Sequence, residues 1–377
     1  MTVYEPWGKR SIAGGLVWIT ERGAFRAFFT LAAVFFVPTC ILALAQGTAF
    51  VDKTSFITLF EDFSTVSDFL VLSPLALVLA GRYYLRISAA VSALVSAESL
   101  LLDRKSASSM VDSANRLMSS PLLSFMPVVA GFAAMMMNAS VRSQYTNDYA
   151  LQGDHSITGW YVVLVTSLFM AAMFELILRA ACSNVLISRL VRPGVRLNPI
   201  AADKCCGFFP IGRAALVLAF VVLVEFFTVL TMLLMDAIYF GRHSSFRVVG
   251  LGAAVVVFSP LLFLWLVMPV HRAMRRAKDS MLGQIDSRSR RLQQDLMQLL
   301  DTGQDVSTDS AYSIADEYDG MRRLHALADE VPSWPVTRLT AVSYTATLLI
   351  PVIVSLAVDT AAAAASNVAT RLPVLPF

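Results

Sequence analysis

The segment from Leu216 to Leu234 reads LVLAFVVLVEFFTVLTMLL, and Glu225 is its one charged residue. It belongs to an apolar run over residues 211–235. A helix needs about 20 mostly apolar residues to cross the roughly 30 Å of hydrocarbon in a bilayer. The run therefore predicts a membrane-spanning helix that carries a carboxyl group near its middle.

The remainder of the chain has the same apolar character. Of its 377 residues, 56% are hydrophobic and 15% are charged, whereas soluble domains contain about 45–50% apolar and about 25% charged residues. A soluble protein of this length could not bury so much apolar surface, so a bilayer is the expected solvent. The composition predicts an all-α, polytopic transmembrane helix bundle in a plasma membrane or a bacterial inner membrane.

Seven apolar segments are candidates for crossing the membrane. The second is the shortest, because Asp68 and Arg82 bound it closely. It can cross if it extends upstream towards Phe56, or if the two charged side chains reach opposite interfaces, with Tyr83 and Tyr84 as an aromatic anchor. The predicted spans are residues 24–46, the segment around 68–82, and residues 121–139, 158–181, 211–235, 248–270 and 338–358.

The charges of the loops alternate along the chain and predict its orientation. Lys and Arg exceed Asp and Glu in residues 1–26, 82–120, 179–213 and 271–291, whereas the acidic loops are residues 47–65 and 140–157. Because cytoplasmic loops carry an excess of Lys and Arg, the pattern places the N-terminus inside and the C-terminus outside. The short loop 236–247 departs from this alternation.

The spans and loops divide the chain into five parts. We expect residues 1–139 to form an N-terminal cytoplasmic segment and spans one to three, and residues 140–195 to form an outer loop and the connecting span four. Residues 196–270 should form an interfacial elbow and spans five and six. Residues 271–337 should form a cytoplasmic helical segment, and residues 338–377 should form span seven and a C-terminal tail.

The cytoplasmic segment begins with a pattern typical of an amphipathic helix, over residues 272–300. We expect this helix to assemble subunits, and we expect an acidic loop over residues 301–319 and a short helix over 321–330 to follow it. Basic side chains near its start suit anionic lipid headgroups, and these are Arg272, Arg275, Arg276 and Lys278.

The elbow between spans four and five reads RLNPIAADKCCGFFPIGR from Arg196 to Arg213. Cys205 and Cys206 lie next to an apolar interface, where cysteines can be acylated. Asp203 alone is too little for a metal site, and the four cysteines of the chain lack metal-ligand spacing. The motifs assemble no catalytic triad, no phosphate-binding glycine loop and no basic-aromatic surface, so we expect no enzyme, no cofactor or metal, and no nucleic-acid partner.

A weak internal repeat divides the spans into two units. Residues 13–19 and 205–211 share a pattern of small residues, glycine and bulky residues before a span, and Leu72-Ser73-Pro74-Leu75 resembles Phe258-Ser259-Pro260-Leu261 in the spans that follow. One interpretation is two parallel three-span units with span four as the connector, an arrangement found in membrane carriers. The other is that such short patterns are common in membrane proteins.

Acidic side chains within or beside the spans are the candidate ion-pathway residues: Glu225, Glu175 and Asp68. A carboxylate in a span is costly and is usually paired, protonated or exposed to water. Glu225 either lies on an ion or proton pathway or is a neutral group that fixes helix packing. Glu175 has Arg179 four residues later on the same helical face, which favours a local ion pair.

The elbow resembles a motif of uncharacterised bacterial polytopic membrane proteins, His-Pro-Asp-x-x-Gly-Gly-Leu before a span with Trp-Pro before the last span. Asp203, Gly207 and Trp334-Pro335 match this motif, whereas Ala201 and Ala202 replace the His and Pro, and Cys206 replaces the first Gly. The resemblance implies no known activity. The architecture is also similar to the seven-span gustatory and odorant receptor channels, which implies a tetramer whose last span lines the pore, although the Gln-Phe of their last-span motif is absent.

These observations leave three functional hypotheses. The first is a homo-oligomeric ion channel or ligand-gated sensor, whose pore the hydroxyl-bearing residues of span seven would line: Thr340, Ser343, Thr345, Thr347 and Ser355. The alternative is a secondary transporter that uses Glu225 as its coupling carboxylate. The third is a membrane scaffold that transports nothing.

Overall fold

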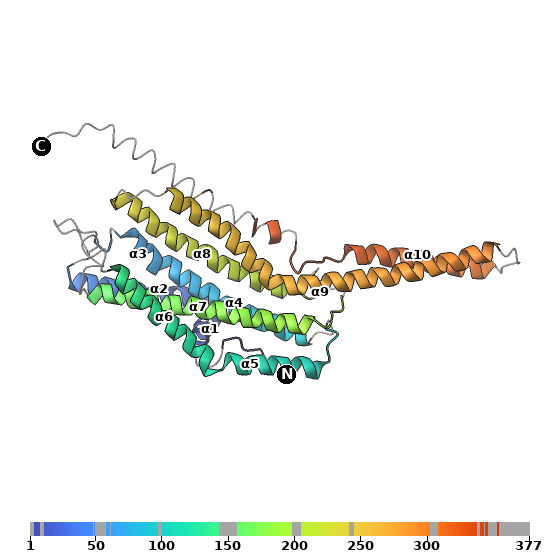
Figure 1. Cartoon of the computed structure of the whole chain (residues 1–377), viewed down its shortest axis with the longest axis horizontal. Coiled ribbons are helices and arrows are strands. Elements are labelled where there is room, and N and C mark those ends of the chain that lie inside the picture. Colours follow the sequence, from blue (N-terminus) through green and yellow to red (C-terminus); the bar gives the residue numbers. More distant parts are fainter. Residues whose placement is uncertain are drawn as a thin grey trace, which may run out of the picture.

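The computed structural model describes residues 4–7, 11–47, 49, 58–60, 62–96, 100–142, 157–197, 205–240, 245–301, 308–337, 340–342, 344–345 and 353. This part of the chain is helical and contains no strand (Figure 1). Its one β contact is an isolated antiparallel bridge between Leu100 and Val195. The all-α prediction is confirmed.

Eleven helical elements follow one another along the described chain. They are α1 (Ile12–Glu21), α2 (Ala24–Ala45), α3 (Phe63–Ser67), the π-helix η1 (Asp68–Leu72), α4 (Ser73–Ser96), α5 (Arg104–Met118), α6 (Pro121–Arg142), α7 (Ile157–Val191), α8 (Phe209–Phe240), α9 (Ser245–Asp301) and α10 (Thr308–Glu330).

Five helical segments in the described part are long and apolar enough to cross a membrane: Ala24–Ala45, Phe63–Ser96, Ile157–Val191, Phe209–Thr231 and Val257–Asp295. The bent pair α5 and α6, at 41° to each other, adds a sixth if it is one span. Predicted span seven lies largely outside the described residues, so the number seven and the orientation stay predictions. The helices fit an integral membrane protein, as the composition predicts.

The second predicted span is extended on both sides of its apolar centre. Its helix runs from Phe63 to Ser96 through η1, so it begins downstream of Phe56. Tyr83 and Tyr84 are fully buried within the protein. The predicted aromatic anchor at the membrane surface is therefore wrong, because both rings pack in the core between helices.

The helices contact each other through small residues. α4 packs against α1 and α8, α6 packs against α7, and α8 packs against α9. A Cβ atom at Gly81 would lie 2.3 Å from the Thr20 Oγ1 of α1, and one at Gly131 would lie 2.9 Å from the Ala171 Cβ of α7. Such glycines let helix backbones approach closely, which is how helices associate where lipid offers no hydrophobic driving force.

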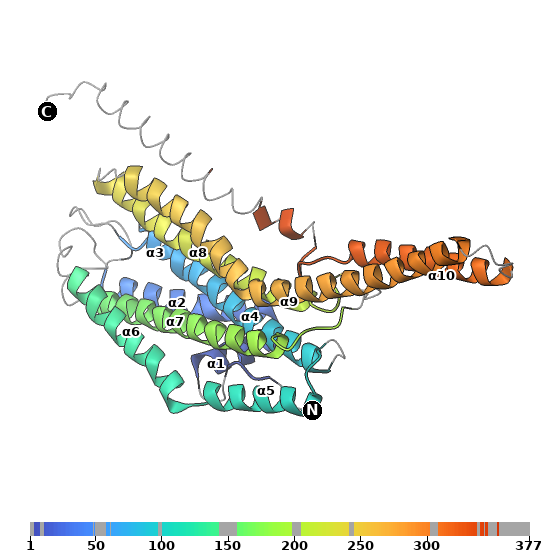
Figure 2. The ribbon, with the colours of Figure 1, turned by 45° about the vertical axis from the view of Figure 1, so that its right-hand side comes forward.

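α9 and α10 form a long hairpin that extends away from the bundle (Figures 1 and 2). α9 continues without a break from the predicted sixth span through residues 272–300. α10 packs antiparallel against it, with Arg288 Nη2 2.7 Å from Glu317 Oε1 and His325 Nε2 3.4 Å from Asp286 Oδ1. The apolar face expected to assemble subunits is thus contacted by α10 of the same chain.

The acidic region after α9 differs from its prediction as a loop over residues 301–319. It is helical from Thr308 onwards and belongs to the same helix as residues 321–330. The side chains of Asp316 and Asp319 are exposed. Acidic composition indicated exposure to solvent correctly, but it did not distinguish a solvated helix from a loop.

We expect Gly81→Ala to destabilise the fold by about 1–3 kcal/mol, because its Cβ would press against the Thr20 hydroxyl and lie 3.1 Å from the Leu16 carbonyl oxygen of α1. Thermal unfolding of the purified protein in detergent measures the change. Gly283→Ala is the matched control, since no atom lies within 4 Å of a Cβ at that position in α9.

Adding Thr20→Ala to Gly81→Ala removes the nearest atom and should recover part of the lost stability. An unchanged melting temperature for Gly81→Ala would contradict the close contact between α1 and α4.

Candidate functional site

Two groups of polar side chains lie inside the bundle. The first, which we call the arginine cluster, consists of Arg179 and Glu175 with the groups they bind. The second, the carboxylate pair, consists of Asp68 and Glu225.

Arg179 is the largest fully buried side chain among the described residues, with 0% of its surface exposed. Its Nε donates a hydrogen bond of 2.7 Å to the Oε1 of Glu175, one helical turn earlier in α7. The predicted local pair is confirmed. A buried charge without a partner costs several kcal/mol, so each of these two residues requires the other.

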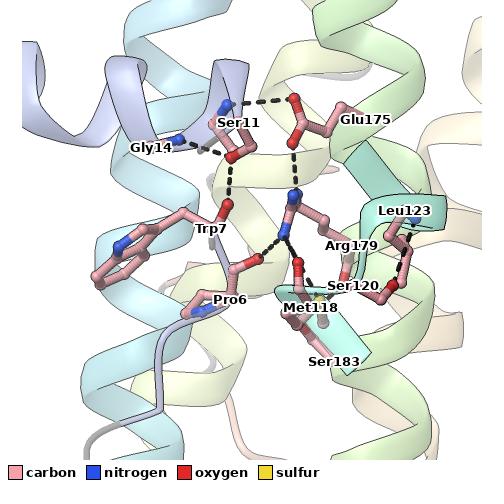
Figure 3. Close-up of polar contacts among 11 residues, drawn as sticks. Pro6, Trp7, Ser11, Gly14, Met118, Ser120, Leu123, Glu175, Arg179 and Ser183 are labelled. Carbon is pink, nitrogen blue, oxygen red and sulfur yellow. Dashed lines mark hydrogen bonds and ion pairs between the residues drawn. The ribbon is translucent and has the colours of Figure 1, made fainter. Parts of the chain in front are cut away.

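The arginine cluster joins segments that are distant in the sequence (Figure 3). Arg179 Nη1 donates to the carbonyl oxygens of Pro6, at 2.8 Å, and Met118, at 3.2 Å. Glu175 Oε2 accepts from the backbone N–H of Ala13 at 3.2 Å. Arg179 Nη2 has no hydrogen-bond partner in the described structure.

The N-terminus of α1 is built to meet this carboxylate. Ser11 caps the helix by accepting from the Gly14 N–H at 3.1 Å, and its hydroxyl donates to the Trp7 carbonyl oxygen. Free N–H groups and the helix dipole make such an end favourable for a negative charge. Glu175 is therefore compensated by both Arg179 and α1, which favours a structural role over a place on an ion pathway.

Tyr4 fixes the preceding segment between α4 and α7. Its hydroxyl lies 2.9 Å from the Ser183 Oγ, and Ser183 in turn donates to the Arg179 carbonyl oxygen at 2.8 Å. The Tyr4 carbonyl oxygen accepts a hydrogen bond from the Ser88 hydroxyl. Burial raises the pKa of the Tyr4 hydroxyl, so this group stays neutral. The role of Tyr4 is not evident from the sequence, because Tyr4 lies outside any predicted span and has no neighbouring motif.

The carboxylate pair brings together two residues that are far apart in the sequence. Asp68 begins η1, where its Oδ1 accepts from the Ser73 hydroxyl at 2.7 Å. η1 contacts α8, the helix that carries Glu225. Two of the three predicted ion-pathway residues thus lie on elements that contact each other, whereas Glu175 belongs to the arginine cluster.

Glu225 faces this site with unused hydrogen-bonding capacity. Its Oε1 is buried and has no hydrogen-bond partner within the described residues. Its helix neighbours Val224 and Phe226 are buried apolar residues. An unpartnered buried oxygen is rare and calls for an explanation.

Asp68 lies in a segment of unusual backbone geometry. In η1 the N–H of Ser73 bonds to the carbonyl oxygen of Asp68, five residues earlier. Pro74 follows and has no N–H with which to continue the α-helical pattern. Single π-turns of this kind occur frequently at functional sites, and this one places Asp68 against α8.

The residues predicted to line a pore are described in part. Thr340 Oγ1 lies 2.7 Å from Thr337 Oγ1, and Thr345 Oγ1 donates to the Ala341 carbonyl oxygen at 2.9 Å. These hydroxyl groups form local bonds, of the kind that cap or follow a helix. Ser343, Thr347 and Ser355 lie outside the described residues, and the pore stays a prediction.

The elbow is a tight, buried turn where the structure describes it. Cys206 and Gly207 adopt φ angles of 56° and 88°, in the left-handed region. The thiols of Cys205 and Cys206 are buried, so this conformation exposes neither one for acylation. Asp203 lies outside the described residues. No group of three or more His, Cys, Asp or Glu residues in the described chain could hold a metal ion.

Three of the four basic residues predicted to bind headgroups are exposed, namely Arg272, Arg275 and Arg276. Lys278 instead holds the end of α10, because its Nζ donates to the carbonyl oxygens of Asp329, at 2.6 Å, and Val331, at 3.1 Å. Lipid binding by the three exposed residues stays a prediction.

Comparisons of the chain with protein-family models, with curated proteins and with solved structures find no match. Both resemblances therefore stay predictions, and the function is argued from the geometry of these two clusters.

We expect Arg179→Met to destabilise the protein by about 3–5 kcal/mol, because it leaves the Glu175 carboxylate buried without its cation. Arg179→Met combined with Glu175→Gln removes both charges and should recover more than half of the loss. Chemical or thermal unfolding in detergent gives the stabilities, and hydrogen–deuterium exchange of residues 4–21 shows whether the N-terminal segment has loosened.

Arg323→Met is the matched control, because its pair with Asp319 is exposed and it should leave unfolding unchanged. The proposed role of the arginine cluster would be refuted by equal stability of Arg179→Met and the wild type.

Proposed function

We propose that the protein is a secondary transporter in which Asp68 and Glu225 together form the coupling site for a proton. The observation that carries this proposal is the buried Oε1 of Glu225, which has no partner among the described residues and lies in α8, the helix that η1 with Asp68 contacts. Its support comes from the chemistry of these two side chains and from their position in candidate membrane spans.

Two ionised carboxylates that lie close together in a membrane bundle repel each other. Like charges at close range disfavour the ionised state of both groups, and low-dielectric surroundings strengthen that repulsion. Uptake of one proton by the pair removes this repulsion. The energy of the site thus depends on whether a proton is bound, which is the requirement for coupling to a proton gradient.

The surroundings favour a proton over a metal cation. The described oxygens available here are the two carboxyl groups and the hydroxyls of Ser73 and Thr228, and these hydroxyls already bond to Asp68 and to the Val224 carbonyl oxygen, respectively. A metal cation needs several oxygens free to point at it, whereas a proton needs one carboxyl oxygen.

The helix that carries Asp68 offers a place for movement. α4 packs against α8 over a long contact, and η1 also contacts α8. A π-turn can change to α-helical geometry by a shift of one residue, so it is a site where a span can rearrange locally. Such a shift would change the distance between Asp68 and Glu225 when the proton binds or leaves.

The transporter is preferred to the channel hypothesis for one reason. The channel rests on hydroxyl groups of predicted span seven, and the described ones form local hydrogen bonds. The transporter rests on two ionisable side chains on contacting membrane helices, one of which has a buried oxygen without a partner in the described structure. A tetramer with span seven on its axis would favour the channel instead.

We expect infrared difference spectra of the protein in lipid to show a carboxylic-acid carbonyl band that disappears as the pH rises and is absent in Glu225→Gln. The band reports protonation at this site without knowledge of the substrate. Asp68→Asn should move it, because the neighbouring charge is removed, and Asp279→Asn, an exposed residue of α9, should leave it unchanged.

In proteoliposomes, Glu225→Gln should abolish any substrate uptake that an imposed pH gradient drives in the wild type. Wild-type uptake by Glu225→Gln, or a titrating band that survives this substitution, would rule out Glu225 as the coupling residue.

A further inference from the structure

A groove lies between α5 and the C-terminal part of α7, apart from both polar clusters. It has a volume of about 360 Å³, and the residues on its two walls include Ser109, Ser113 and Leu117 from α5, and Cys182, Val185 and Arg189 from α7. The α5 residues recur every four positions, and the α7 residues every three to four, so each wall is one face of a helix. The volume is within the range of small-ligand sites.

Contacts at both ends of the groove show the relative direction of the two helices that form its walls. Near one end of the groove, Arg179 of α7 donates to the carbonyl oxygen of Met118, the last residue of α5. Near the other end, the Leu101 N–H, just before α5, donates to the Gly194 carbonyl oxygen, just after α7. The helices are therefore antiparallel, and α5 lies beside the C-terminal part of α7 in both views (Figures 1 and 2).

The groove is polar at one end and apolar at the other. Because the walls are antiparallel, Ser109 lies towards Arg189, while Leu117 lies towards Cys182. Arg189 is exposed and forms no ion pair with any described carboxylate. Leu117 and Val185 expose 52% and 50% of their surfaces.

The position of the groove along α7 agrees with this polarity. α7 has 35 residues, which corresponds to a length of about 52 Å, well above the roughly 30 Å of hydrocarbon. Predicted span four ends at residue 181, which places Cys182 at the edge of the hydrocarbon and Arg189 in the headgroup region. Cys182 lies about 10 Å back along the helix, towards the acyl chains.

We propose that this groove binds an anionic phospholipid, with one acyl chain against Leu117 and Val185 and the phosphate at Arg189. The free guanidinium supplies the charge that selects an anionic headgroup. The exposed apolar side chains supply the contact that a soluble anion would not use. Lys105 and Arg192, both exposed, lie about one turn beyond Ser109 and Arg189 and add positive charge at the same end.

Cys182 provides a reporter within the native chain. It is a free, partly exposed thiol on the groove wall, so an acyl chain in the groove should shield it from alkylation. Cys40, also free and partly exposed but in α2, serves as an internal reference. Peptide mapping after N-ethylmaleimide treatment separates the two rates.

The test compares phosphatidylglycerol with phosphatidylcholine added to the purified full-length protein in detergent. We expect phosphatidylglycerol to slow the alkylation of Cys182 and leave Cys40 unaffected, and phosphatidylcholine to protect less. Arg189→Gln should weaken the phosphatidylglycerol effect by about fivefold in half-maximal lipid concentration. Arg116→Gln, an exposed arginine of α5 outside the groove, is the matched control and should keep the wild-type response.

A second variant tests the groove independently of charge. Val185→Trp fills the groove and should reduce the number of phosphatidylglycerol molecules that stay bound in native mass spectrometry. Ile177→Trp, at an exposed position two turns earlier in α7, should not.

Three results would overturn the proposal. The first is that both lipids protect Cys182 equally, in the wild type and in Arg189→Gln alike. The second is that neither lipid protects it. The third is that inorganic phosphate alone protects it, which would indicate an anion site without a bound acyl chain.

Discussion

The buried ion pair of Arg179 and Glu175 is the constraint on which the packing of the N-terminal segment and α5 against α7 depends. A guanidinium that is withdrawn from water must have its charge balanced and its donors used. Its Nε bonds to Glu175, and its Nη1 bonds to the carbonyl oxygens of Pro6 and Met118. These bonds fix the N-terminal segment and the bend between α5 and α6 relative to α7. The hydrogen bonds of the Arg179 side chain therefore hold these segments of the chain together.

The two polar clusters differ in the way their charges are balanced. The arginine cluster pairs opposite charges and adds a helix N-terminus beside the carboxylate, so it has little to gain from another ion. The carboxylate pair consists of two groups of the same sign on contacting elements, and it leaves an oxygen of Glu225 without a partner in the described structure. The arginine cluster therefore suits a structural role, whereas the carboxylate pair suits a site that binds and releases a proton.

The sequence was sufficient for the features that depend on local pattern. Hydrophobicity predicted the helical class and the long apolar helices, and the spacing of four residues predicted the pair of Glu175 and Arg179. It was insufficient wherever distant segments meet. Nothing near Tyr4 indicates that its ring packs between α4 and α7, and no local pattern places η1 with Asp68 against α8. The boundary predicted near residue 271 stays a prediction: hydropathy changes there, but α9 continues through it without a break.

The continuous helix α9 has a mechanical consequence. It has 57 residues, which corresponds to about 85 Å of unbroken helix. Near the level where it leaves the apolar segment, it is clamped to the chain that follows α10, because His271 Nδ1 lies 2.8 Å from the Ser333 carbonyl oxygen and its ring stacks on Trp334 at 3.9 Å. A change in the direction of α9 at this clamp would therefore displace the far end of the hairpin, which lies away from the bundle (Figure 1).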